Sequence, residues 1–169
     1  MNNIEHLESK LIFYESYHHD FYNKLIHVVF VPLLLYTGIA IVNYYSEILA
    51  IIGALFYSVY YCYLDLFGGI SYSAIIYYMY QKREAYDFLT IVYFHIFSWI
   101  VQIFSHKNFE QRAPAFLDGI FTSLTIAPIY IWLELLSLVG YKKKFIKNIY
   151  NKGGEKSKEY FQSLKDKKK

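Results

Sequence analysis

Histidines are the residues whose type and spacing most clearly suggest chemistry in this chain. Three of the six, His18, His19 and His27, fall within ten residues, where a polar N-terminal arm becomes apolar. A neutral imidazole is a common ligand of iron, zinc and copper. Ionisable side chains within or beside apolar membrane helices are costly, so they are candidates for a functional site. The cluster therefore indicates either a metal site or histidines that form hydrogen bonds at a membrane boundary.

A second stretch, residues 98–118, can supply partners for these histidines. Its relevant side chains are Trp99, Gln102, His106, Glu110, Arg112 and Asp118. The first three have the spacing i, i+3 and i+7, which places them on one face of a helix that ends at His106. The three charged residues have two readings. They are a carboxylate ligand and a cationic anchor for an acidic head group, or a loop ion pair and a helix cap.

Helical geometry limits which histidines can meet. At about 100° per residue, His19, Asn23 and His27 share a face of a continuous helix, whereas His18 and His27 lie about 180° apart. His18 can join His27 only if the helix starts or bends between them. The spacing is less specific than a metalloprotease HExxH motif. Geometry alone therefore leaves a metal site and hydrogen-bonded histidines both open.

Composition indicates a membrane protein of one-domain length. Hydrophobic residues make up 56% of the 169-residue chain and charged residues only 18%; ordinary soluble domains contain roughly 45–50% apolar residues. No strand alternation or heptad repeat competes with the helical pattern. We predict an all-α fold, an integral membrane helical bundle of about four or five hydrophobic helices. Some of these can be re-entrant, because several apolar runs fall short of the ~20 residues that a span needs.

The pattern also predicts individual elements. Residues 3–24 have the three- and four-residue apolar spacing of an amphipathic helix, which we expect to lie along the membrane surface. The expected apolar segments are residues 25–45, 48–64, 70–80, 88–104 and 119–133. Two of these should form a helical hairpin that turns at Gly68-Gly69, and Pro114 should mark a turn or a helix start.

Charge is unevenly distributed along the chain. Residues 142–169 hold 11 Lys and three acidic residues, whereas the remaining residues hold 6 basic and 11 acidic side chains. This favours a membrane-embedded domain at 1–141, whose first 24 residues are the amphipathic arm, and a solvated basic tail at 142–169 on the cytosolic side. The tail can also bind anionic head groups. Nucleic-acid binding is disfavoured because the body is apolar and slightly acidic, and the single cysteine, Cys62, excludes a disulfide framework or a multi-cysteine zinc site.

Several of these residues together resemble a known family. The matching pattern consists of Tyr17-His18-x4-Asn23-x3-His27-x4-Pro32, Trp99-x2-Gln102-x3-His106-x3-Glu110-x3-Pro114-Ala115-x2-Asp118, Ala127-Pro128 and Glu134. The chain resembles the Mpo-type family, small endoplasmic-reticulum membrane proteins that act as iron(II)-dependent 2-hydroxy fatty acid dioxygenases. The resemblance runs from about residue 11 to residue 141, and both blocks occur in the same order and separation.

The resemblance implies a function and a set of site residues. It implies that iron(II) and dioxygen shorten a long-chain 2-hydroxy fatty acid by one carbon, a step of phytosphingosine breakdown. It makes His18, His27 and His106 the expected catalytic iron ligands, and domain 1–141 the catalytic one. Asn23 and Gln102 then orient ligands. Glu110, Arg112 and Asp118 are further candidates for contact with the substrate or support of the site.

Two positions depart from the family pattern. Related members often have proline where this chain has Phe21, and a second arginine where it has Ala113. The missing proline leaves the bend between His18 and His27 without its usual cause. The missing arginine leaves Arg112 as the remaining candidate for anchoring the substrate carboxylate.

Two other functions compete with the dioxygenase. The first is a non-catalytic membrane protein of the same fold that binds or organises lipids. It requires no redox metal and tolerates histidine replacement. The second is another metal-dependent lipid enzyme, such as a hydroxylase, but the paired histidine-rich boxes of membrane hydroxylases are absent from the sequence.

Overall fold

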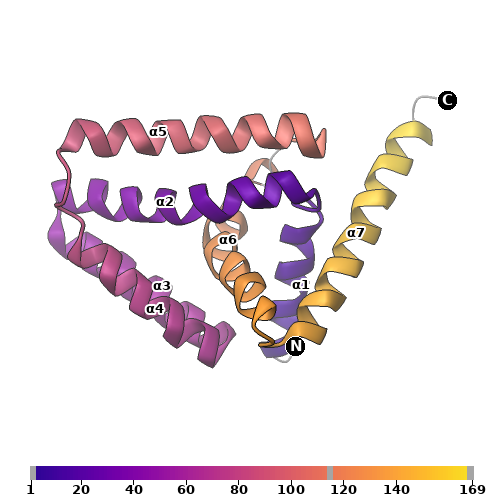
Figure 1. Ribbon diagram of the computed structural model, residues 1–169, viewed down its shortest axis with the longest axis horizontal. Helices are drawn as coiled ribbons and strands as arrows, with labels where there is room; N and C mark the ends of the chain where they lie inside the picture. Colours follow the sequence, from indigo (N-terminus) through magenta and orange to yellow (C-terminus); the bar gives the residue numbers. More distant parts are fainter. Residues whose placement is uncertain (1–2, 114–115, 167–169) are drawn as a thin grey trace. The chain divides into compact units, whose positions relative to one another are not determined.

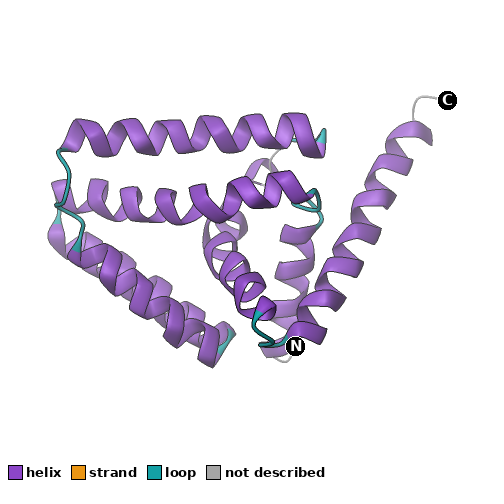
Figure 2. Ribbon diagram, viewed as in Figure 1, coloured by secondary structure: helices purple, strands orange, loops and turns teal. Residues whose placement is uncertain are grey.

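The computed structural model describes residues 3–113 and 116–166, without the side chains of residues 3, 4, 116–118, 120 and 121. All regular secondary structure in these two ranges is helical, as Figure 2 shows, so the all-α prediction is confirmed. The elements are α1 (Asn3–Glu15), α2 (Phe21–Tyr45), α3 (Glu47–Leu64), α4 (Leu66–Gln81), α5 (Phe88–Ser105), the π-helical turn η1 (His106–Glu110), α6 (Phe116–Leu138) and α7 (Lys143–Asp166). Pro114, where the sequence predicts a turn or helix start, lies outside the described residues.

Within the described ranges, three stretches are long and apolar enough to cross a membrane: Phe21–Tyr45, Glu47–Leu64 and Phe88–Glu110. A shorter apolar helical stretch, Thr122–Leu138, lies within α6. Many large aliphatic and aromatic side chains on α3, α4 and α5 are exposed. Exposed apolar surface of this extent is expected where lipid, rather than water, is the solvent. These features indicate a membrane protein.

The chain divides into two compact units. One contains Met1–Leu25 with Ser105–Lys169, and the other contains Ile26–Phe104. Their boundary lies inside the continuous helix α2. Each unit has its own packing, which follows from its own side chains.

In the unit Ile26–Phe104, α2 and α5 pack antiparallel. Phe30 meets Phe97 with ring centroids 5.9 Å apart, and towards the other end Tyr44 stacks on Phe88 at 4.0 Å. At the polar end of the same unit, the Arg83 guanidinium donates to Asn43 Oδ1 and pairs with a carboxylate of α3. Apolar contacts along the helices and charged contacts at one end are typical of membrane helices.

Helices α3 and α4 form the predicted hairpin, but the turn is earlier than expected. Helix α3 ends at Leu64 and α4 begins at Leu66, so the break is at Asp65, whose side chain accepts a hydrogen bond from Gly68 N at 2.7 Å. The prediction that the helices meet at Gly68-Gly69 is therefore wrong. Gly69 instead lets α4 pack directly on α3, because a Cβ there would overlap the backbone of Cys62.

The other unit joins α1, α6 and α7. Helix α7 (yellow in Figure 1) packs on α1 through a buried face that contains Ile146, Ile149, Gly153, Gly154 and Ser157. Its lysines lie on the exposed sides. The segment that the sequence predicts as a solvated basic tail is therefore a helix with a buried face. This face repeats every three or four residues, the spacing of one side of a helix.

The N-terminal arm is not one helix, contrary to the prediction for residues 3–24. Helix α1 ends at Glu15 and α2 begins at Phe21. Asp20 starts α2, since its Oδ1 accepts hydrogen bonds from Tyr22 N at 2.8 Å and Asn23 N at 3.1 Å. An Asp in this position satisfies backbone donors that the first helical turn leaves without partners. The chain thus changes direction between His18 and His27 without a proline at position 21.

Candidate metal centre

His18 lies in the turn that follows α1 and is fixed by that helix. Its Nδ1 lies 2.8 Å from the backbone oxygen of Tyr14, and its ring is parallel to the Tyr14 ring, 3.8 Å away. Because a carbonyl oxygen only accepts, Nδ1 is the donor, and in the neutral ring Nε2 keeps its lone pair. These contacts therefore orient His18 so that the lone pair of Nε2 can bind a metal ion.

His106 begins the π-helical turn η1 at the end of α5. Its side chain is buried, and its ring meets the His18 ring edge-on at 4.5 Å. A π-turn adds a residue to the helical repeat, and such turns often occur at functional sites. The sequence prediction placed His106 at the end of a regular helix and missed the π-helical turn that begins there.

His27 completes the cluster. Helix α2 is continuous from Phe21 to Tyr45, so His27 stands one turn after Asn23. The candidate ligand atoms of His18, His27 and His106 all lie within 4.8 Å of one another, and each of the three residues exposes 4% or less of its surface. Three imidazoles so close together can hold a metal ion. The structure thus brings together the three histidines that the family resemblance selects.

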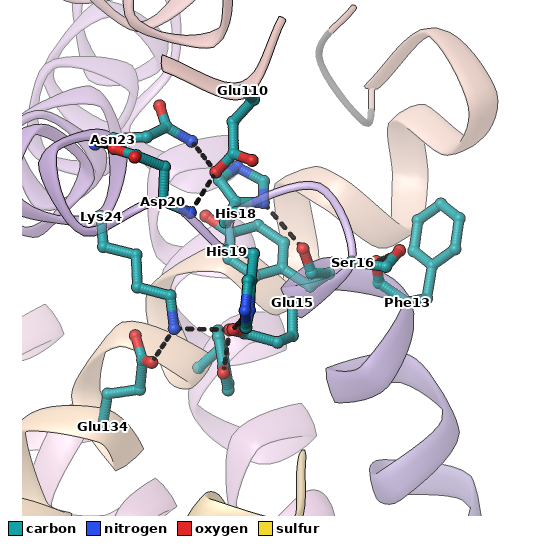
Figure 3. Close-up of polar contacts among 12 residues, drawn as sticks. Phe13, Glu15, Ser16, His18, His19, Asp20, Asn23, Lys24, Glu110 and Glu134 are labelled. Carbon is teal, nitrogen blue, oxygen red and sulfur yellow. Dashed lines mark hydrogen bonds and ion pairs between the residues drawn. The ribbon is translucent and has the colours of Figure 1, made fainter. Parts of the chain in front are cut away.

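A hydrogen-bonded chain connects η1 to the start of α2. Glu110 Oε1 accepts from Asp20 N at 2.8 Å and from Asn23 Nδ2 at 3.0 Å, and Ser105 Oγ donates to Asn23 Oδ1 at 2.6 Å. Asn23 and Glu110 are buried, and Figure 3 shows them facing each other beside His18. These contacts hold the segment that carries His106 against the segment between His18 and His27. Ser105 is a member that the sequence analysis missed.

The other predicted site residues have different surroundings. Gln102 is buried and donates to Ser98 O in its own helix, at 3.2 Å. The Arg112 guanidinium lies 3.4 Å from the centre of the Tyr17 ring and 3.8 Å from that of Tyr160, and it donates to a backbone oxygen of the turn after α1. Asp118 falls in α6, but its side chain lies outside the described part of the chain. Gln102 and Arg112 are thus held by contacts of their own.

Two other histidines have separate partners. His95 Nδ1 lies 2.8 Å from Thr37 Oγ1, and its Nε2 accepts from Trp99 Nε1 at 3.2 Å. His19 Nδ1 lies 2.9 Å from a carboxylate oxygen of Glu15. Both residues lie outside the group of three that can hold a metal ion. The prediction that distinguished them from His18, His27 and His106 rested on the family pattern, and the observed contacts agree with that distinction.

A partly buried charged cluster lies in the unit that holds His18 and His106, and sequence reasoning missed it. Lys24 Nζ lies 2.6 Å from Glu15 Oε2 and 2.6 Å from Glu134 Oε1, and Tyr130 Oη donates to Glu15 Oε2 at 2.5 Å. Figure 3 shows Lys24 between the two carboxylates. The available signal was one lysine and two glutamates at the edges of apolar segments, since opposite charges in apolar surroundings pair with each other.

Tyr14 connects the charged cluster to the histidines. Its ring stacks on His18 and meets the Tyr130 ring edge-on at 5.3 Å. Burial, followed by the carboxylates of Glu134, Glu15 and Glu110, raises the pKa of Tyr14 well above its usual range. Its hydroxyl is therefore a neutral donor at any physiological pH.

Comparison with known proteins identifies relatives over most of the chain. The family described as "2-hydroxy-palmitic acid dioxygenase Mpo1-like" matches residues 4–139. The 2-hydroxy-palmitic acid dioxygenase MPO1 of Saccharomyces cerevisiae is 32% identical over 143 residues, which cover 80% of this chain and 82% of the yeast protein. No solved structure matches the chain. The resemblance seen in the sequence is thereby confirmed: the chain belongs to the Mpo1-like family.

Proposed function

We propose that this protein is an iron(II)-dependent dioxygenase that shortens long-chain 2-hydroxy fatty acids by one carbon. The observation that carries the proposal is the buried group of His18, His27 and His106, with ligand atoms within 4.8 Å of one another. Membership of the Mpo1-like family supports the reaction class, and the name of the yeast relative supports a 2-hydroxy fatty acid as substrate.

The donor atoms are suited to iron. The group consists of three imidazoles without thiolate or carboxylate, and imidazole ligands suit iron, zinc and copper alike. Because the related protein is a dioxygenase, a metal with redox chemistry is favoured over zinc. When bound, iron(II) supplies the electrons that activate dioxygen.

The protein's own residues hold and shape the site. The Tyr14 carbonyl fixes the His18 tautomer, and Asn23 with Glu110 holds the segment that carries His106. Such supporting contacts typically change metal affinity or activity by 10- to 100-fold when they are removed. The acyl chain of the substrate gains roughly 0.8 kcal/mol per CH₂ on leaving water. This favours a site that opens to the bilayer.

We also propose the cellular setting. The protein is a multi-pass protein of the endoplasmic-reticulum membrane, with residues 1–141 as its catalytic domain and the basic segment 142–169 on the cytosolic side. The 11 lysines of that segment support this orientation, because Lys-rich segments next to spans stay in the cytosol. The expected context is phytosphingosine breakdown. Gln102, Arg112 and Asp118 are retained as candidates for supporting the site or contacting the substrate.

The decisive experiment measures iron content and product together. Wild type and the variants His18→Ala, His27→Ala and His106→Ala are purified, loaded with iron(II) without oxygen, and assayed with 2-hydroxypalmitate after oxygen is admitted. We expect near-stoichiometric iron and a fatty acid one carbon shorter from wild type, and loss of both in each variant. His6→Ala, which alters a histidine outside the group of three, is the matched control and should behave as wild type.

Two results would contradict the proposal. Turnover that survives in one histidine variant removes that residue from the ligand set. Wild type that binds no iron and forms no product leaves the alternative, a non-catalytic membrane protein that binds or organises lipids.

A further inference from the structure

The substrate proposed above carries a carboxylate, which a buried site stabilises through a cation, a metal or hydrogen-bond donors. A buried carboxylate without donors is strongly disfavoured. Two cations of the unit that holds His18 and His106 contact residues beside His18, namely Lys24 and Arg112, and both are engaged. Lys107, next to His106 in sequence, is exposed. Lys24 lies between Glu15 and Glu134, and Arg112 lies against two tyrosine rings. Neither is available for the substrate without losing these contacts.

One buried donor next to the histidines has no such engagement. The Tyr14 side chain is 3% exposed, and its hydroxyl has no hydrogen-bond partner among the residues that the structure describes. A buried hydroxyl without a partner costs free energy, and in native proteins it calls for an explanation, such as a role in binding. Stacking on His18 keeps the Tyr14 ring 3.8 Å from a candidate ligand.

From these observations we propose that the Tyr14 hydroxyl binds the substrate, donating a hydrogen bond to its carboxylate. This inference rests on the proposed function, because it uses the 2-hydroxy fatty acid as substrate. Stacking of Tyr14 on His18 sets the distance between the hydroxyl and the histidine group, so the head group is held beside the site. The Tyr14 hydroxyl is then a substrate-binding group, whereas the backbone carbonyl of the same residue supports the metal site through His18.

The test is binding of ligand without turnover, so it does not depend on activity. Tyr14→Phe and wild type are placed in lipid nanodiscs, loaded with iron(II) and kept free of oxygen, and the affinities for 2-hydroxypalmitate and for palmitate are measured by calorimetry. Phenylalanine keeps the ring that stacks on His18 and removes only the hydroxyl. Because a hydrogen bond to a charged group contributes to the binding free energy, Tyr14→Phe should bind both acids roughly 10- to 100-fold more weakly than wild type. Iron content should be unchanged.

The matched control is Tyr61→Phe. Tyr61 is also fully buried, its hydroxyl also lacks a partner among the described residues, and it lies between other tyrosines of α3 and α4. Loss of a hydroxyl there should leave both affinities unchanged.

Three outcomes overturn the inference. If wild type shortens 2-hydroxypalmitate and Tyr14→Phe binds both acids as wild type does, the inference fails while the proposed function stands. If Tyr14→Phe weakens only 2-hydroxypalmitate, the partner is the 2-hydroxyl rather than the carboxylate. Wild type that neither binds nor shortens 2-hydroxypalmitate overturns both the inference and the proposed function.

Discussion

Two buried polar clusters differ in how their charges are balanced. In the histidine cluster, three side chains of the same kind bring candidate ligand atoms within 4.8 Å of one another. In the charged cluster, Lys24 lies between the carboxylates of Glu15 and Glu134, each 2.6 Å from its Nζ. The first arrangement brings together lone pairs that a cation can share. In the second arrangement the cation is part of the protein.

This difference suggests a separate purpose for each cluster: the histidine cluster serves binding, and the charged cluster serves stability. A buried cluster of opposite charges that is already paired needs no ligand, and breaking it leaves an uncompensated charge. A buried cluster of like donors is completed by something that is not part of the chain. We therefore expect replacement of the histidines to remove binding with little loss of stability, and disruption of the charged cluster to cost stability first.

Lys24→Met should have the largest effect on stability. It leaves Glu15 buried and Glu134 partly buried without their cation, and removing one partner of a buried ion pair typically costs about 3–5 kcal/mol. The measurement is thermal unfolding in detergent, beside His106→Ala, which should unfold close to wild type after iron is removed from both.

Lys147→Met is the matched control, because Lys147 is exposed on α7. It should unfold as wild type. If Lys24→Met also unfolds as wild type but loses substrate affinity, the charged cluster is part of the binding site and the comparison fails.

Gly153→Ala should have the next largest effect. A Cβ at this position would overlap the Glu15 side chain, so α7 has to move away from α1. Overpacking of this kind typically costs about 1–3 kcal/mol. Gly53→Ala on α3 is the matched control, since a Cβ there meets nothing within 4 Å, and alanine favours a helix by up to about 1 kcal/mol. Thermal unfolding of the two variants should therefore shift in opposite directions; a stabilised Gly153→Ala would show that α7 does not depend on this close contact.

Composition and local patterns in the sequence are sufficient for the helical class, whereas the candidate metal ligands came from the family resemblance. Hydrophobic composition predicts membrane helices, and the family pattern selects His18, His27 and His106. The break that lets His18 approach the other two was left open, because the usual proline is absent at Phe21. Asp20 supplies the helix start instead. An Asp before an apolar run is a recognisable start signal, so this feature was within reach of the sequence.

Long-range pairing was beyond the sequence. Lys24 and Glu134 are 110 positions apart, and nothing in their local pattern specifies that they meet. The local pattern around Gly153 and Gly154 likewise does not specify their contacts, because it resembles that of a flexible tail. In the structure their lack of side chains lets α7 pack on Glu15 and His19. A pair of glycines that suggests flexibility in the sequence allows close packing between helices in the structure.

The smallest effect on stability is expected at His95. Comparing His95 with His106 tests, within one residue type, the distinction between structural residues and metal ligands. Trp99 Nε1 only donates, so His95 Nε2 accepts and its Nδ1 donates to Thr37 Oγ1, and both ring nitrogens are engaged. His95→Phe should cost about 0.6 kcal/mol for the lost hydrogen bond to Thr37, which joins two membrane helices, and should retain full iron. The same substitution at His106 should lose the iron, since it removes a proposed ligand. Metal analysis of the two folded variants decides between these roles. Iron lost from a folded His95→Phe would mean that hydrogen-bond satisfaction does not separate structural histidines from metal ligands in this protein.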